Sequence, residues 1–251
     1  MRKTLTLAAA LLCAFTLQAA DLTVDEILAK NTEARGGLEK LQKVKSMRFN
    51  GKLSVGGMEA AFIMAKKRPE MVKMEFTIQG MTGVQAYDGA TGWMVMPFMG
   101  KKDPEAMTGD MLKEFKDQAD FDGPFVDYAK KGNKVELLGK GDVEGTPAYK
   151  VKLTTKEGNE TIVYIDAETF LEVKMEAKRK MQGQEVEGET TLGNYQEVEG
   201  LLIPFSIEMK AKGVPAGQSI TIEKAELNVD IEDAAFKMPA VKPAAAEAVK
   251  Q

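Results

Sequence analysis

Apolar side chains occupy every second position over much of the segment from 47 to 99. The alternation runs through 47–55, 58–64 and 71–79, and an apolar run at 93–97 follows the Asp88-Gly89 pair. Successive side chains of a strand point to opposite faces, so this period predicts strands with one apolar and one polar face. Asp-Gly favours a tight turn between two of them.

The same kind of pattern returns in the second half of the chain. Turn residues such as Glu157-Gly158-Asn159 and Asp166-Ala167-Glu168 separate short apolar-alternating runs. These runs cover 135–138, 149–153, 162–165, 171–177, 186–192, 202–211 and 219–229. Short strands with regular turn signals indicate an antiparallel meander. The sequence therefore predicts a mainly β fold of about ten or eleven strands with a few helices.

Two segments have helical spacing instead. Thr23 and Glu26 form a capping box before an apolar stripe that Gly36-Gly37 ends, which predicts a helix over 24–34 and a second short turn after it. From Pro104, the spacing of apolar residues predicts a helix over 105–119 with this proline in its first turn. A short amphipathic piece is expected over 125–132.

The first twenty residues have the composition of a secretory signal peptide. Arg2 and Lys3 precede the apolar run 5–17, and small residues stand before the polar Asp21. The run is too short for a membrane-spanning helix. A lipid-modified cysteine would follow a small residue, but Cys13 follows two leucines. We therefore do not expect a lipoprotein anchor. We expect residues 1–20 to be removed, 21–239 to form one domain, and the Ala- and Pro-rich stretch 240–251 to be disordered.

Composition excludes several kinds of site. The chain has no histidine, and its one cysteine lies in the signal peptide, so no histidine triad, thiol nucleophile or Cys/His zinc site is expected. Glu157 and Glu160 fall in a turn, where carboxylates are solvated, and Asp117, Asp120 and Asp122 lack the rest of a calcium loop. A net charge of −4 with interspersed lysine and glutamate argues against a nucleic-acid partner. We predict a binding protein without cofactor or metal, rather than an enzyme.

A curled sheet of this length must cover its apolar face. A second sheet would give a sandwich with a solid core, and the pattern leaves that alternative open. Two short helices cannot fill the concavity of so many strands, so under the other alternative a cleft remains. Ten of the sixteen methionines lie between Met58 and Met111, and their flexible side chains suit varied apolar guests, although such a stripe is also common in cores.

An apolar cavity of this kind would bind hydrocarbon, since each buried methylene contributes about 0.8 kcal/mol. For Trp93 the alternative is a structural role, because a tryptophan between a sheet and a helix commonly fills the core. The residues predicted to line the cavity are Phe49, Phe62, Met64, Met74, Phe76, Trp93, Met94, Met96, Met107, Met111 and Phe115.

Several motifs, taken in order, resemble the periplasmic lipoprotein carriers of the LolA/LolB type. The resemblance rests on the segments Lys67-Arg68-Pro69, Tyr87-Asp88-Gly89-Ala90-Thr91-Gly92-Trp93, Ala34-Arg35-Gly36-Gly37-Leu38, Gly200-Leu201-Leu202-Ile203-Pro204 and Asp233-Ala234-Ala235-Phe236-Lys237-Met238-Pro239. It spans most of residues 24–239. It implies an incomplete β-barrel, a curled antiparallel sheet with a lid of short helices, around a cavity for lipoprotein acyl chains.

The resemblance also implies that Arg68 latches this lid by binding backbone carbonyls of a helix. A guanidinium is always charged and has five donors, which suits that task, although a solvated charge at a strand end is the alternative. The leading hypothesis is a periplasmic carrier of lipoprotein acyl chains or lipids toward the outer membrane, with membrane-bound donor and acceptor proteins as partners. The alternative is a sensor of mislocalised lipoprotein or lipid in envelope stress.

Overall fold

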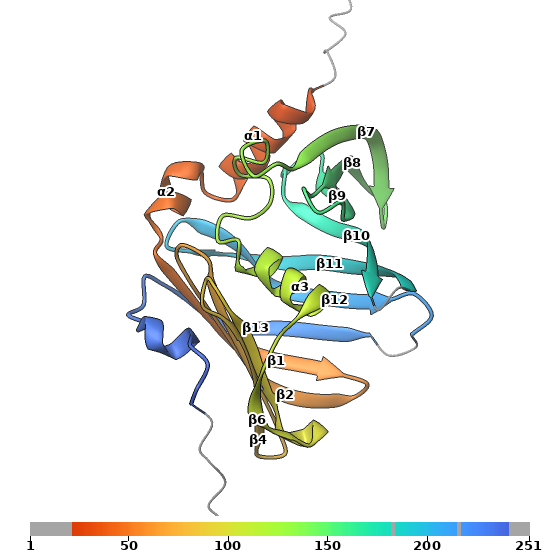
Figure 1. Ribbon diagram of the computed structural model, residues 1–251. Helices are drawn as coiled ribbons and strands as arrows, with labels where there is room; N and C mark the ends of the chain where they lie inside the picture. Colours follow the sequence, from red (N-terminus) through yellow and green to blue (C-terminus); the bar gives the residue numbers. More distant parts are fainter. Residues whose placement is uncertain (1–21, 182–183, 215–216, 241–251) are drawn as a thin grey trace, which may run out of the picture.

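The computed structural model describes residues 22–181, 184–214 and 217–240, which form a mainly β protein (Figure 1). The predicted signal peptide and all but the first residue of the predicted tail lie outside the described residues. Within the described ranges, no helix combines the length and the apolar character that crossing a bilayer requires.

The helices of the described chain are α1 (Val24–Ala34), α2 (Leu38–Lys43), α3 (Gly109–Ala119) and the short 3-10 helices η1 (Pro97–Met99) and η2 (Asp233–Phe236). The capping and spacing signals predict three of these helices, namely α1, α2 and most of α3. The predicted capping box is confirmed: Thr23 accepts from the amide of Glu26, and the Glu26 carboxylate accepts from Thr23.

The strands form one antiparallel sheet. They are β1 (Ser46–Val55), β2 (Met58–Lys67), β3 (Met71–Ile78), β4 (Met81–Tyr87), β5 (Gly92–Met96), β6 (Lys101–Ala106), β7 (Lys134–Val143), β8 (Thr146–Thr154), β9 (Glu160–Asp166), β10 (Glu172–Met181), β11 (Gln184–Val198), β12 (Leu201–Ala211) and β13 (Gln218–Leu227). In the described chain their order is β6-β5-β4-β3-β2-β1-β13-β12-β11-β10-β9-β8-β7. Because β6 and β7 are opposite edges, the sheet is a curled, incomplete barrel as predicted, and the alternative of a two-sheet sandwich is excluded (Figure 1).

The described part of the chain already has thirteen strands, so the predicted count of ten or eleven is too low. The alternation misses β4 and β6. In β4, Gly83 interrupts the apolar period because a Cβ there would lie 2.7 Å from the ring of Phe76. In β6, charged residues and a proline replace the apolar period, as is common at a sheet edge.

Two helix predictions need correction. Pro104 lies in the edge strand β6, where its missing N–H costs little, and α3 begins at Gly109 after Thr108. The predicted start of this helix at 105 is therefore wrong. Residues 125–132 form consecutive turns rather than an amphipathic helical piece.

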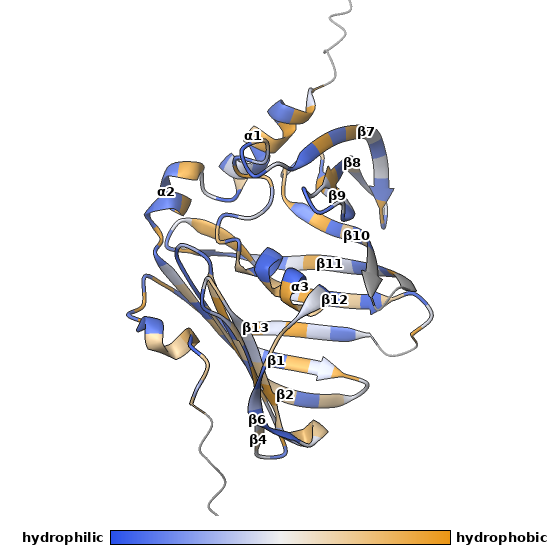
Figure 2. Cartoon of the chain, in the orientation of Figure 1, coloured by the Kyte–Doolittle hydropathy of each residue, from blue (hydrophilic) through white to orange (hydrophobic). Residues whose placement is uncertain are grey.

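The apolar face of the sheet has three covers. Helix α1 packs Ile27 and Leu28 against β8 and β9, and α3 packs Phe115 and Ala119 against β3 and β4. Between them lie α2 and the loop 120–131, which we call the central cover (Figure 1). Figure 2 shows the strand pattern that produces this one-sided burial, with hydrophobic and hydrophilic positions alternating along β11 and β12.

The sheet is split beneath the central cover. Strands β12 and β13 pair only from Ser206 to Met209, although β12 begins at Leu201. Pro204 has no N–H to donate, and the ladder to β13 starts only after it. The amide of Leu202, free of that ladder, donates to the carbonyl of Arg35 at 3.0 Å. The end of α1 therefore lies against the open part of the split.

Candidate ligand-binding cavity

A cavity of about 220 Å³, partly open to solvent, lies at the split between the sheet and the central cover. Apolar side chains from β1, β2, β12, β13, α2 and the loop after α3 form most of its wall. The lining residues are Thr32, Arg35, Gly37, Leu41, Met47, Phe49, Met64, Lys66, Phe121, Val126, Leu201, Leu202, Ile203, Pro204, Ile207 and Ile222.

Two of the residues predicted to line a cavity do so, namely Phe49 and Met64. Four others lie on the same face of the sheet, on α3 or in the segment just before α3, but form a packed cluster with Val72 and Tyr87. These four are Met74, Met94, Met107 and Phe115. Helix α3 therefore fills the part of the concave face where the methionines concentrate, and the open space lies nearer to β12 and β13.

The remaining predicted residues lie away from this cavity. Phe62 is paired with Phe76, whose ring centroid is 5.6 Å from that of Phe98. Met96 is also buried, and none of these side chains lines the cavity. Met111 is exposed on α3, with 43% of its surface accessible.

Trp93 lies on the opposite face of the sheet from Met94, because adjacent strand residues point in opposite directions. Its register partner Ala86 pairs with Lys73, and its indole N–H donates to the carbonyl of Phe236 at 2.7 Å. Trp93 therefore anchors η2 to the sheet and does not line the cavity.

Arg68, in the turn after β2, binds the C-terminal end of α2. Its Nε donates to the carbonyl of Val44 at 2.7 Å, and its Nη2 donates to the carbonyl of Leu41 at 3.0 Å. The last carbonyls of a helix have no partner within the helix, so these bonds satisfy them. The helix contacts that the resemblance implies for Arg68 are thus present in the structure.

Arg68 also binds a partner that the sequence does not reveal. Its guanidinium donates to both carboxylate oxygens of Asp122, one of them at 2.8 Å, and lies 4.3 Å from the ring centroid of Phe121. Hydrogen bonds from Arg68 hold the pKa of Asp122 below its usual value, against the effect of burial. One side chain therefore joins both parts of the central cover.

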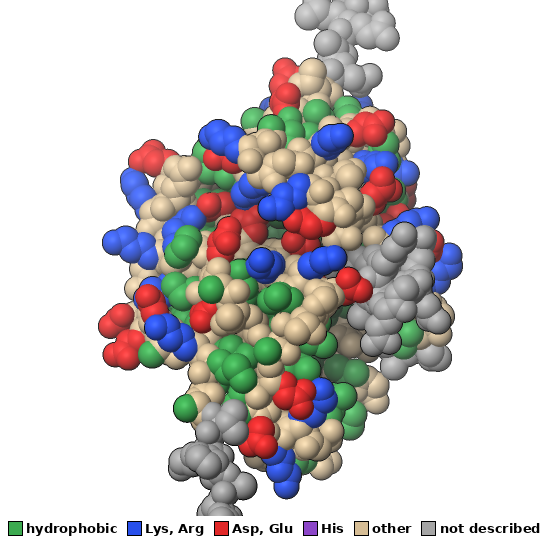
Figure 3. All heavy atoms as spheres, in the orientation of Figure 1, with side chains coloured by type: hydrophobic (Ala, Val, Ile, Leu, Met, Phe, Trp, Pro, Cys, Tyr) green, Lys and Arg blue, Asp and Glu red, His purple; other side chains and the backbone are tan. Residues whose placement is uncertain are grey.

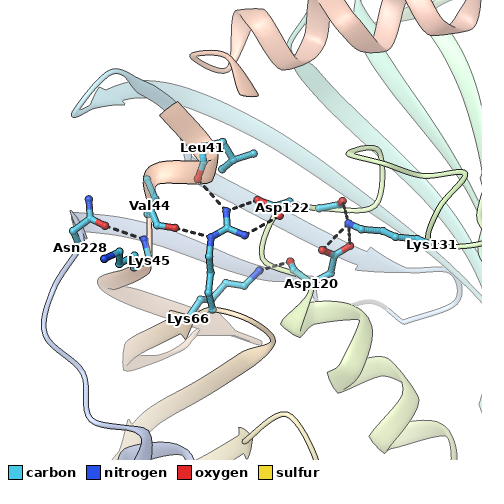
Figure 4. A network of polar contacts seen from close by, with 10 residues as sticks. Leu41, Val44, Lys45, Lys66, Asp120, Asp122, Lys131 and Asn228 are labelled. Carbon is cyan, nitrogen blue, oxygen red and sulfur yellow. Dashed lines mark hydrogen bonds and ion pairs between the residues drawn. The ribbon is translucent and has the colours of Figure 1, made fainter. Parts of the chain in front are cut away.

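A second set of contacts fixes the loop 120–131 (Figure 4). Lys131 donates to both carboxylate oxygens of Asp120, at 2.8 and 2.6 Å, and to the carbonyl of Gly123. Lys66 donates to the backbone carbonyl of Asp120 at 2.8 Å. Asp120 and Asp122, which the sequence offers as weak metal ligands, are instead engaged with cationic side chains.

Lys66 is the polar residue of the cavity that sequence analysis could have found. It continues the series Phe62, Met64, Lys66 at two-residue spacing, so it occupies the apolar face of β2. Burial lowers its pKa to about 8, while Asp120 opposes this shift and Arg35 adds to it. No comparable signal marks Phe121 or Ile207, because their place at the cavity depends on how distant segments meet.

On the face seen in Figure 3, basic and acidic side chains are interspersed rather than separated into a basic patch. Within the described residues, no group of three or more acidic side chains is placed to hold a metal ion. The site is therefore an apolar cavity whose charged neighbours mostly bind one another.

Known structures share this architecture, although no protein-family model and no curated protein matches the sequence. A DUF1329 family protein from Desulfovibrio piger ATCC 29098 has a TM-score of 0.62 at 14% identity, over 87% of this chain and 99% of that chain. A LolA superfamily protein from Nitrosomonas europaea has a TM-score of 0.58 at 16% identity, over 86% and 98%.

A domain from Vibrio parahaemolyticus, named for outer membrane lipoprotein sorting, has a TM-score of 0.56 at 12% identity, over 84% of this chain and 94% of that chain. At these identities the likeness concerns the fold. The chain has a LolA-like fold, and the predicted curled, incomplete barrel is confirmed.

Proposed function

We propose that this protein is a periplasmic carrier that holds an acyl chain of a lipid or lipoprotein for transport toward the outer membrane. The observation that carries the proposal is the mainly apolar cavity between the split sheet and the central cover. The LolA-like fold supports it, since one structure that shares the fold is named for lipoprotein sorting. Export by the predicted signal peptide would bring the protein to the periplasm.

The volume of the cavity indicates what it holds in this conformation. It is larger than the ~150 Å³ cavity that binds benzene in an engineered protein, and smaller than the ~300–1,000 Å³ of ordinary ligand pockets. It therefore accommodates part of one hydrocarbon chain. A whole chain requires more room, and each further methylene buried contributes about 0.8 kcal/mol toward opening it.

The central cover is the element that would move. Leu41, Phe121 and Val126 of the cover line the cavity, and Arg68 ties both parts of the cover to the sheet. Breaking the contacts of this one side chain would loosen α2 and the Asp122 end of the loop together, while Lys66 and Lys131 would still hold Asp120. We propose that Arg68 is the latch of the carrier.

The proposed role is binding rather than catalysis. The acidic side chains beside the cavity hold the cover, since Asp120 binds Lys131 and Asp122 binds Arg68. Loading and release would then depend on membrane-bound donor and acceptor proteins that displace the cover.

Native mass spectrometry of the protein, purified gently from periplasm, tests the proposal directly. We expect a bound lipid or acylated species that is released and identified on activation. Delipidated protein should then bind a fluorescent acyl probe with saturation. Protein that carries no lipid and binds no acyl probe would count decisively against a carrier.

A further inference from the structure

The charged residues of the cavity wall are of one sign. Among the lining residues, Arg35 and Lys66 carry charge, and both are cations. Buried cations are unfavourable unless an anion or several hydrogen bonds compensate them. The groups that balance the charges of Arg35 and Lys66 therefore indicate which ligands the cavity can bind.

Lys66 has no carboxylate partner in the described part of the chain. Its Nζ donates to the backbone carbonyl of Asp120 at 2.8 Å and lies 5.8 Å from the ring centroid of Phe121. The two acids whose charges act on Lys66 are already engaged: the carboxylate of Asp120 binds Lys131, and that of Asp122 binds Arg68. The ammonium group of Lys66 is thus held in a mainly apolar wall with a neutral acceptor.

Arg35 is compensated by a loose ion pair and by solvent, since its side chain is 36% exposed. Its Nη1 lies 3.7 Å from a carboxylate oxygen of Glu172, which is longer than a hydrogen bond. The amide of Leu202 donates to the carbonyl of Arg35, so its backbone is fixed at the split. A guanidinium that is fixed at its base and weakly paired at its tip is available to a ligand.

The charge of Arg35 disfavours the charged form of Lys66. Burial lowers the pKa of Lys66 to about 8, and the positive charge of Arg35 contributes to this shift. The other charged groups facing Lys66 are Asp120, Asp122 and Lys131. An anion between Lys66 and Arg35 would relieve the repulsion and complete the hydrogen bonding of both.

We infer that the ligand is an anionic amphiphile whose hydrocarbon chain fills the apolar cavity while a carboxylate or phosphate binds Lys66 and Arg35. The inference rests on the proposed function and narrows its ligand class. A neutral acyl chain of the same length would gain the apolar contacts alone. An anionic amphiphile would in addition accept charge-assisted hydrogen bonds from an ammonium and a guanidinium, and would therefore bind more tightly than the neutral chain.

Calorimetric titration of delipidated protein with decanoate, decan-1-ol and decylammonium tests this, because the three compounds share a chain and differ in charge. We expect decanoate to bind at least tenfold more tightly than decanol, and decylammonium to bind most weakly. Decyl phosphate, which has the same chain, repeats the comparison with decan-1-ol for a phosphate. The anion that binds more tightly than the alcohol identifies the headgroup.

Two variants connect the preference to the proposed residues. Lys66→Met and Arg35→Gln should each lower the ratio of decanoate affinity to decanol affinity, measured on the same variant. Lys210→Gln is the matched control, since it removes an exposed lysine from β12, a strand that also lines the cavity. It should leave the preference intact.

The outcomes separate the inference from the proposed function. If no compound binds the wild-type protein, the carrier proposal itself fails. If neutral and anionic compounds bind equally in both series, or if the cation binds best, hydrocarbon binding stands and the anionic class is overturned. The comparison within the wild-type protein decides this even if a variant does not fold.

Discussion

The guanidinium of Arg68 donates to both oxygens of the Asp122 carboxylate, across 54 positions of sequence. The same guanidinium binds the last carbonyls of α2, so one side chain connects the β2–β3 turn, a helix and a loop. Its side chain is 25% exposed and that of Asp122 is 23% exposed, which places the pair at the boundary between core and solvent. We therefore expect the stability of the central cover to depend on this contact.

Replacing Arg68 by leucine should open the central cover. The change leaves the carbonyls of Leu41 and Val44 and a carboxylate without their donor, which should lower the free energy of unfolding by roughly 2–4 kcal/mol. Release of a bound acyl probe should accelerate. Urea denaturation and stopped-flow fluorescence measure the two effects. Arg48→Leu, on the other face of the sheet, is the control, and equal behaviour of the two variants would disprove the latch.

Acid should weaken the contact between Arg68 and Asp122. Because Arg68 holds the pKa of Asp122 below its usual value, its stabilisation is present above the unfolded-state pKa and is lost as the pH falls through the folded-state pKa. The loss therefore belongs below about pH 4. Other carboxylates titrate there too, so the measured quantity is the stability difference between wild type and Asp122→Asn, which should shrink on acidification. A difference that is constant from pH 6 to pH 3 would contradict this.

Lys66 should make the protein relatively more stable at alkaline pH. Its pKa is about 8 in the folded protein and 10.5 as the ordinary value, so between these values the unfolded chain binds a proton that the folded chain does not. Stability from this group therefore rises with pH across that window, by about 3 kcal/mol at most. Lys66→Met should lack this rise. The free energy of unfolding of the variant, relative to that of wild type, should therefore fall from pH 8 to pH 10. Parallel pH profiles of chemical denaturation would refute it.

Filling the cavity should abolish acyl binding without unfolding the protein. Ile207 lines the cavity from β12, and the empty space of about 220 Å³ can take the extra atoms of phenylalanine. We expect Ile207→Phe to reduce acyl-probe affinity at least tenfold and to change stability by less than about 1.5 kcal/mol. Leu138→Phe, at an exposed position of β7, should leave binding unchanged. Undiminished binding in Ile207→Phe would place the ligand elsewhere.

Alanine at Gly36 should be much more destabilising than alanine at Gly89. Both glycines have positive φ, +115° and +94°, which costs an L residue roughly 1–2 kcal/mol. At Gly36 a Cβ would also lie 2.2 Å from the carbonyl oxygen of Gly200, whereas at Gly89 no atom lies within 4 Å. We expect the difference in unfolding free energy to exceed about 1 kcal/mol. Equal losses in thermal or urea denaturation would show that the α1–α2 turn can move away from β12.

The sequence by itself determined the local structure. The capping box at Thr23, the Asp88-Gly89 turn and the two-residue period of β1 to β3 depend on near neighbours, and the structure bears them out. The motif order around Arg68 indicated the LolA-like architecture. Strand β6 escaped prediction because an edge strand carries charges and a proline in place of the apolar period.

Only the tertiary structure decided where the cavity lies. The methionine-rich half of the sheet looks like a binding face, yet α3 packs on it, and the open space lies where β12 and β13 separate. Which apolar surface is covered depends on the meeting of segments far apart in the chain, such as Arg68 with Asp122. A periodic pattern specifies the face to which a side chain belongs, but the partner across that face is set by the packing of the whole sheet.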